Sequence, residues 1–415
     1  MQINRNKKNL KSNFYRNIAI LCGISILVEI LVFTLTPTVL HSFIDQWGFR
    51  VYFETIIIPF VENGNLPYIN YFWEYPVVMV VPVFIAAIPS VIFKDATLFF
   101  IVFPVLMIIC NLITTTLVYI ITLKIYNSEK RAFAAGFLYA TSIAAAYITI
   151  TNFDPLPVMF VMIGLACTIN WNLKWCGYLS YVLGFFTKIY PIAILPFLVM
   201  YNAKKTSLQE EIKNVVLVGI IPFLILFVSI YLLNPESINT YLIANAAGKE
   251  IFVDSFVYTI YSWIHGVVHI PVSTQTISTV MTAVLIGVFC LLGYRSYFTK
   301  KQSPVFLLQV ILVALVAIIA CSKYHSPQYM LWFMPILCIL IAGDLLQMGM
   351  FYLLQMVWFI KFPLLFWNTY TNNEYTHPLP AMGGYFTLLF FTIEYAILFY
   401  LVWDVTNKGV IYVSE

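Results

Sequence analysis

The sequence predicts an all-α, polytopic membrane protein with about twelve transmembrane helices and with interfacial helices in its first external loop. Apolar residues make up 61% of the 415 positions and charged residues only 10%, a balance that a soluble particle of this size cannot hide in its core. Apolar runs of about 17–25 residues, each long enough to cross roughly 30 Å of hydrocarbon as a helix, recur from end to end. Because no soluble domain fits between these runs, residues 1–415 are expected to form a single transmembrane domain.

The distribution of lysine and arginine orients the predicted spans, because these residues concentrate in cytoplasmic loops. Five of the 22 basic residues lie in the N-terminal tail, before the first predicted span. We therefore expect the N-terminus in the cytoplasm, and 16 of the 22 basic residues then face that side. The predicted spans are 17–37, 97–122, 132–151, 155–172, 177–187, 189–202, 214–233, 276–294, 303–321, 328–344, 346–367 and 385–404. The fifth and sixth of these are short enough to form a tight hairpin.

The run 76–93 is also apolar enough to cross the membrane, and its assignment decides the orientation of everything after it. If this run crosses the membrane, ten basic residues lie on the cytoplasmic side and twelve on the external side. This distribution opposes the preference of lysine and arginine for cytoplasmic loops. We therefore expect it at the outer interface or as a re-entrant segment, with Pro82 and Pro89 breaking its helix. A full span remains the alternative.

Polar segments collect on the external face in this arrangement. The first external loop, 38–96, combines acidic residues with tyrosines and tryptophans, and the second long external segment, 234–275, is rich in the aromatic residues typical of the headgroup region. Ten of the 18 acidic residues lie on this face. The sequence thus predicts a site built from loops on one side of the membrane.

Four motifs in a fixed order carry a resemblance. They are GNLPYINYFWEYP at 64–76, NFDPLP at 152–157, GFFTKIYPIAILP at 184–196 and SPQYMLW at 326–332. In this order they resemble the polytopic glycosyltransferases of the GT-C superfamily, in particular the polyprenyl-phosphate-dependent, mannosyltransferase-like group, and they are similar to the mannosyltransferase of glycolipid-anchor synthesis. The resemblance covers residues 40–345.

The resemblance implies a GT-C-like integral enzyme whose site faces away from the cytoplasm, in the plasma membrane or, in a eukaryote, in the endoplasmic reticulum. Such enzymes move a hexose, mannose or similar, from a polyprenyl-phosphate-linked donor to a hydroxyl of a lipid or glycan acceptor, and many use a carboxylate of the first loop as base. Members often carry Asp-x-Asp, or a single aspartate, shortly before a tyrosine-containing helix. This sequence reads Gly-Phe-Arg at 48–50 instead.

Three carboxylates of the first external loop are candidates for the base, because attack by an alcohol needs a carboxylate within hydrogen-bond reach of the hydroxyl. They are Asp45, Glu54 and Glu74. Each has a structural alternative. Asp45 suits the N-cap of an interfacial helix, Glu54 suits the solvated face of a helix over 52–62, and Glu74 suits bonds to the backbone amides of its own loop.

Other candidates lie on the same predicted face. Asp154 precedes Pro155 at the mouth of a span, where it joins the site or caps the helix. Lys188 is the leading candidate for the donor phosphate, because a charge between two apolar segments is costly unless it reaches a partner or snorkels to the interface. Further candidates for substrate or phosphate binding are Arg50, Lys323, His325, Tyr190 and Gln328.

The remaining expectations concern cofactors and competing functions. A lipid monophosphate carries less charge than a nucleotide diphosphate, so no cofactor is expected and a divalent metal is compatible but not implied. Expected partners are the lipid-linked donor, the acceptor and membrane lipid, with no nucleic acid. Two alternatives stay open: a lipid or glycan transporter or flippase, which predicts charges or broken helices near the midplane, and a catalytically inactive GT-C-like membrane partner.

Overall fold

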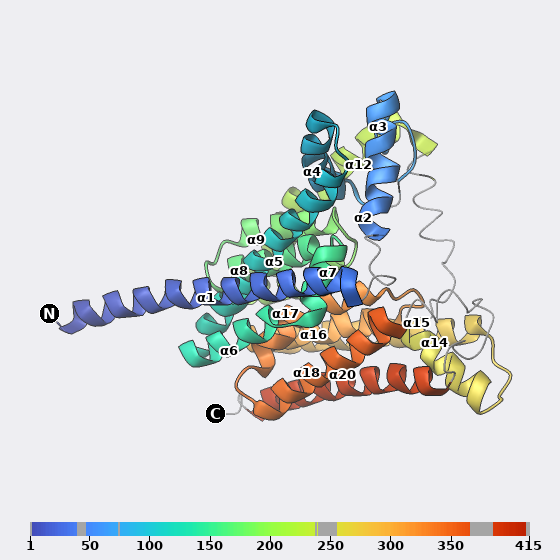
Figure 1. Ribbon diagram of the computed structural model, residues 1–415. Helices are drawn as coiled ribbons and strands as arrows, with labels where there is room; N and C mark the ends of the chain where they lie inside the picture. Colours follow the sequence, from blue (N-terminus) through green and yellow to red (C-terminus); the bar gives the residue numbers. More distant parts are fainter. Residues whose placement is uncertain are drawn as a thin grey trace.

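The computed structural model describes residues 2–39, 47–73, 75–236, 239, 255–365 and 385–411. Every regular element in these ranges is a helix, and the sole extended pairing among them is an isolated bridge between Pro67 and Tyr71 (Figure 1). The expectation of an all-α fold is therefore confirmed.

The helices in the described ranges follow one another along the chain in a fixed order. They are α1 (Gln2–Val39), α2 (Trp47–Tyr52), η1 (Phe53–Ile57), α3 (Ile58–Asn63), η2 (Val77–Met79), α4 (Val80–Phe93), α5 (Thr97–Tyr126), α6 (Glu129–Ala140), α7 (Ile143–Thr151), α8 (Pro155–Ile169), α9 (Lys174–Phe185), α10 (Pro191–Ala203), α11 (Leu208–Val215), η3 (Val216–Ile220), α12 (Ile221–Leu233), α14 (Phe256–Tyr261), η4 (Ser262–Val267), α15 (Thr274–Phe298), α16 (Pro304–Cys321), η5 (Pro327–Tyr329), α17 (Met330–Ile341), α18 (Leu345–Phe359), η6 (Ile360–Leu365) and α20 (Tyr385–Ile411).

Seven helices in the described part of the chain are long and apolar enough to cross a membrane: Asn13–Leu35, Thr97–Tyr126, Leu208–Leu233, Thr274–Phe298, Pro304–Cys321, Leu345–Phe362 and Leu388–Lys408. The pair α6 and α7, bent by 49°, makes an eighth if it is counted as one span. The protein is thus a polytopic membrane protein. The expected count of about twelve is not confirmed, because α8, α10 and α17 are apolar but only 12–15 residues long.

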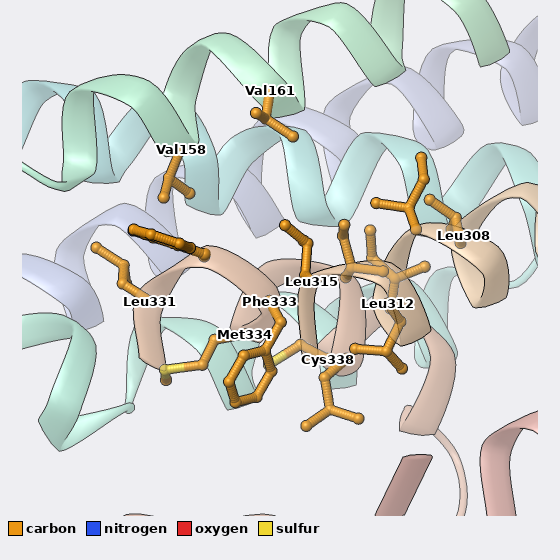
Figure 2. Close-up of a cluster of buried hydrophobic side chains, with 14 of the residues drawn as sticks. Val158, Val161, Leu308, Leu312, Leu315, Leu331, Phe333, Met334 and Cys338 are labelled. Atoms are coloured by element: carbon orange, nitrogen blue, oxygen red, sulfur yellow. The ribbon is translucent and has the colours of Figure 1, made fainter. Parts of the chain in front are cut away.

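The short helix α17 forms the centre of the bundle. All twelve of its residues are buried, and side chains from α8 and α16 pack against it (Figure 2). The side chains labelled there are Val158, Val161, Leu308, Leu312, Leu315, Leu331, Phe333, Met334 and Cys338. Because lipid chains are as apolar as leucine, such helices associate through close packing rather than through removal of apolar surface from water.

Glycines bring α8 and α9 into close contact. A Cβ on Gly164 would lie 2.6 Å from Cδ2 of Tyr181, and one on Gly177 would lie 2.9 Å from Oγ1 of Thr168. We expect Gly164→Ala to lower the free energy of unfolding by about 1–3 kcal/mol through overpacking, as measured by denaturation in mixed detergent micelles. Gly287→Ala on α15 is the control, since nothing lies within 4 Å of its Cβ position. An equal loss in both variants would contradict the packing explanation.

Basic residues tie distant segments together at one end of the bundle, which we call the basic end. There Arg131 donates to the carbonyl of Leu340 at 3.3 Å, and Lys408 pairs with Asp344 at 2.7 Å. Helix α1 begins and α20 ends on the same side of the molecule (Figure 1). Helix α17 runs from Trp332, which is described below, to Leu340 at this end.

The apolar run 76–93 forms η2 and α4. Val78 donates to the carbonyl of Phe186 at 2.9 Å, and α4 packs beside α5 after a turn at Lys94, whose φ is 54°. The expectation that its prolines break the helix is wrong: α4 runs without interruption from Val80 to Phe93. Pro82 lies in the first turn, where no intrahelical N–H bond is lost, and the helix accommodates Pro89.

Candidate functional site

Asp154 and Lys188 form a buried ion pair between segments far apart in the sequence. The Lys188 Nζ lies 2.7 Å from Oδ1 and 2.9 Å from Oδ2 of Asp154. The indole Nε1 of Trp332 donates to the same Oδ1 at 2.7 Å. The Asp154 side chain is 0% exposed and that of Lys188 13%. The pair therefore joins the α7–α8 turn, the α9–α10 link and the start of α17.

The local structure explains why both charged groups point inward. Pro155 opens α8, but the side chain of Asp154 makes no bond to the first turn of that helix, so the helix-cap alternative does not apply. Lys188 lies in the link between α9 and α10, whose first residue is Pro191. Its ammonium reaches a carboxylate instead of snorkelling to the surface.

Aromatic rings enclose the ammonium. The Lys188 Nζ lies 5.0 Å from the ring centroid of Phe153, 4.8 Å from that of Tyr329 and 5.2 Å from that of Trp332. The Trp332 ring is stacked between Tyr190, at 4.1 Å, and Tyr329, at 3.9 Å. Such contacts attract a cation through the ring quadrupole, and the apolar surroundings screen the charge of Lys188 far less than water does.

The segment predicted as the first external loop packs against this cluster through Phe153. Tyr52 and Tyr75 contact the Phe153 ring edge to face, at centroid distances of 5.7 and 5.2 Å. Trp73 in turn contacts both tyrosines. We call the cluster of Asp154, Lys188 and Trp332 with these rings the aromatic end of the bundle. Segments from the first loop and from α8, α10 and α17 meet there.

Of the three base candidates in the first loop, the structure describes Glu54. Asp45 and Glu74 lie outside the described residues. Glu54 accepts a hydrogen bond from Nε of Arg50 at 2.8 Å, and both side chains are about half exposed. Two residues along a helix turn by roughly 200°, so these two charges lie on the face opposite Tyr52. The structure does not bring Glu54 and Arg50 together with Lys188.

The remaining predicted site residues fall into two groups. Tyr190 belongs to the aromatic end through its stack on Trp332. His325 is buried, and its ring centroid lies 5.4 Å from that of Tyr329, which stacks on Trp332. Lys323 instead lines a pocket of about 360 Å³ beside the start of α15. Gln328 accepts a hydrogen bond from the Ser326 hydroxyl.

A second buried ion pair escaped the sequence analysis. The Lys361 ammonium pairs with Glu394, and their side chains are 1% and 3% exposed. Lys361 also lies 5.9 Å from the ring of Tyr395, which packs against His325 at 6.4 Å. The available signal was a lysine and a glutamate within the predicted spans 346–367 and 385–404, because ionisable residues inside a membrane are costly and need a partner.

Trp332 also went unrecognised as a partner of Asp154. Its position as the last residue of the SPQYMLW motif marked the segment but did not identify the indole as a hydrogen-bond donor. No group of three or more potential metal ligands occurs within the part of the chain that the structure describes. The arrangement offers a fixed cation, a ring cage around it and a polar first loop beside it.

The sequence matches no family model, no curated protein and no solved structure. The GT-C resemblance consequently depends on the four motifs alone.

The buried imidazole of His325 makes stability depend on pH. Burial and the nearby Lys361 ammonium hold the pKa of His325 well below its usual range. The unfolded chain therefore takes up a proton near pH 6.5 that the folded protein does not. We expect stability to fall as pH drops below about 6.5, by up to about 1.4 kcal/mol per pH unit from this group.

His325→Gln should remove this contribution from the slope of unfolding free energy against pH between 7 and 5. His269→Gln, at an exposed position, should leave the slope of the wild type in place. If the slope of the His325 variant equals that of the wild type, the imidazole does not stay neutral in the folded protein.

Proposed function

We propose that the protein is a GT-C-like membrane glycosyltransferase, which moves a mannose-like hexose from a polyprenyl-phosphate donor to a hydroxyl of a lipid or glycan. The buried Lys188–Asp154 pair is the observation that carries the proposal. It fixes a cation at the end of the bundle where the first loop packs, and three of the four motifs that resemble the family contribute to it. We place this end on the extracytoplasmic side of the plasma membrane or of the endoplasmic reticulum.

Lys188 has the properties of a phosphate ligand in such a reaction. The acceptor oxygen forms a bond to the anomeric carbon, the bond from that carbon to the phosphate oxygen breaks, and the phosphate leaves with the electron pair. A positioned ammonium stabilises the charge that develops on the leaving oxygen. The Lys188 side chain keeps 13% of its surface exposed, while its carboxylate partner is fully buried.

Asp154 then acts as a positioning residue rather than as the base. Both of its oxygens contact Lys188, and Oδ1 also accepts from Trp332. The proton of the attacking hydroxyl needs a carboxylate that is free to accept it. Since Glu54 is paired with Arg50 on the outer face of its helix, we assign the base to Asp45 or Glu74.

The test is sugar transfer by the purified full-length protein in lipid vesicles. A radiolabelled polyprenyl-phosphate mannose is supplied together with membrane lipid as acceptor, and labelled product is separated from the donor. We expect transfer that persists when a chelator is present. If the folded protein transfers no sugar from any polyprenyl-phosphate hexose, the inactive-partner alternative replaces the enzyme.

A transporter or flippase is the second candidate, and charges inside the membrane-spanning helices favour it. Besides Lys361 and Glu394, the buried Glu29 of α1 accepts a hydrogen bond from Asn111 of α5 at 2.7 Å. Tyr139 of α6 donates to the same asparagine at 2.8 Å. Movement of a lipid-linked sugar across vesicles, without chemical change, would support this function.

A further inference from the structure

A large pocket lies at the basic end. It is beside the last turn of α17, whereas Lys188 lies beside Trp332 in the first turn of that helix. Its volume is about 830 Å³, and it lies between α6, α16, α18 and α20. The polar residues that line it are Arg131, Ser303, Gln309, Asp344, Gln347 and Lys408. Neither the resemblance nor the proposed transfer reaction assigns a role to this pocket.

Arg131 presents an unused donor at the pocket. One guanidinium nitrogen, Nη2, donates to the carbonyl of Leu340, and Cζ lies 3.4 Å from the ring centroid of Tyr126. Nε is buried and has no hydrogen-bond partner among the described residues. Because a buried donor without a partner is costly, the held guanidinium is suited to an anionic ligand.

Arg131 is also the one charge in the pocket that no acidic residue neutralises in the described structure. Lys408 lies 2.7 Å from both Asp344 and Asp404, so its ammonium is already held by two carboxylates. Gly343, with a φ of 97°, lets the chain turn beside the Arg131 stem, where a Cβ would lie 3.8 Å from Nε.

Three helices begin at the pocket. Arg131 is the third residue of α6, Ser303 caps α16 through the N–H of Phe306, and Asp344 caps α18 through the N–H of Leu346. The N-terminus of a helix carries a partial positive charge and favours anions.

Apolar side chains frame the same pocket. Leu345 and Leu346 are 84% and 61% exposed, and Val305 and Val405 complete this part of the lining. A charged group held by an arginine beside exposed leucines matches the head and chains of an anionic lipid, and basic pockets between transmembrane helices on the cytoplasmic side bind such head groups.

We propose that this pocket binds an anionic phosphate group, with Arg131 as its principal ligand. The phosphate belongs to a membrane lipid or to a soluble compound. Charge-assisted hydrogen bonds from the terminal nitrogens of the guanidinium suit phosphate oxygens. Such binding is independent of the transfer reaction proposed above.

The experiment uses the full-length protein, purified in a neutral detergent and stripped of lipid. Its melting temperature is followed against inorganic phosphate, with sodium chloride at equal ionic strength as reference, and against phosphatidylglycerol, with phosphatidylcholine as reference. We expect a saturable rise with at least one of the two phosphate probes. A response to phosphatidylglycerol alone identifies a lipid, and a response to inorganic phosphate identifies a soluble ligand.

Three variants make the test specific. Arg131→Gln should weaken the apparent affinity by about tenfold or more, since it removes charge-assisted hydrogen bonds. Lys130→Gln, at the exposed neighbouring position on the same helix, should leave the affinity unchanged. Leu346→Trp, which narrows the mouth while Arg131 stays in place, should weaken it as well.

Two results would overturn the proposal. The first is the absence of a saturable response to either probe in the wild-type protein. The second is an equal loss of affinity in Lys130→Gln and Arg131→Gln, which would mean that the general positive charge of this end, and no defined site, attracts phosphate.

Discussion

Lys188→Gln is expected to lower the rate of sugar transfer by about 10²–10³-fold, the usual effect of removing one group that stabilises developing negative charge. Lys188 is the ammonium held by Asp154 and enclosed by aromatic rings. Lys188→Arg, which keeps the charge, should retain more activity than the glutamine variant. The rate is measured as labelled product formed in vesicles at saturating donor, with the amount of folded protein determined in parallel.

The buried pair of Lys174 and Glu211 supplies a matched control for this prediction. Lys174 lies 2.7 Å from Glu211, with side chains 17% and 0% exposed, nearly as in the Lys188–Asp154 pair. Lys174→Gln should cost a similar amount of stability and leave transfer by the folded fraction unchanged. If both glutamine variants reduce transfer equally, Lys188 contributes to stability alone.

Asp154→Asn separates a positioning residue from a base. The asparagine can still accept from Trp332 but no longer holds the ammonium, so we expect a loss of about tenfold or more in rate. Because the proposed base lies in the first loop, the acidic limb of the pH–rate profile should persist in this variant. Disappearance of that limb would instead assign the proton transfer to Asp154.

Local signals predicted much of the fold. Long apolar runs such as 97–122 and 303–321 indicated helices that the structure contains as α5 and α16. The number of spans could not be predicted with the same certainty, because a short apolar helix such as α17 owes its place to neighbours that bury it on all sides. Hydropathy measures composition along the chain and carries no information about such neighbours.

The candidate site was only partly predictable for a related reason. The cost of an isolated lysine in an apolar segment indicated that Lys188 has a partner, and the orientation of the loops placed Asp154 on the same side. The identity of the partner, 34 residues away, and the indole of Trp332, 178 residues from the aspartate, follow from tertiary packing. Glu54 and Arg50 were candidates because they lie in the predicted first external loop, but they pair with each other on the helix face opposite Tyr52.

The buried pair of Lys361 and Glu394 should produce the largest change in stability. Removal of one partner, as in Glu394→Leu, leaves an uncompensated charge and should lower the free energy of unfolding by about 3–5 kcal/mol. The double variant Lys361→Met with Glu394→Leu removes both charges, and it should recover most or all of this loss. The free energy of unfolding of the wild type, of Glu394→Leu and of the double variant is measured by denaturation in mixed detergent micelles.

The exposed pair of Arg50 and Glu54 is the control, since loss of such a surface pair costs about 0.2–1 kcal/mol. A double variant that is no more stable than Glu394→Leu would show that the two charges do not compensate each other. The double variant also separates the two candidate functions. A glycosyltransferase whose chemistry depends on Lys188 should keep its transfer activity without this pair, whereas a transporter that uses charges within the membrane should lose its flux.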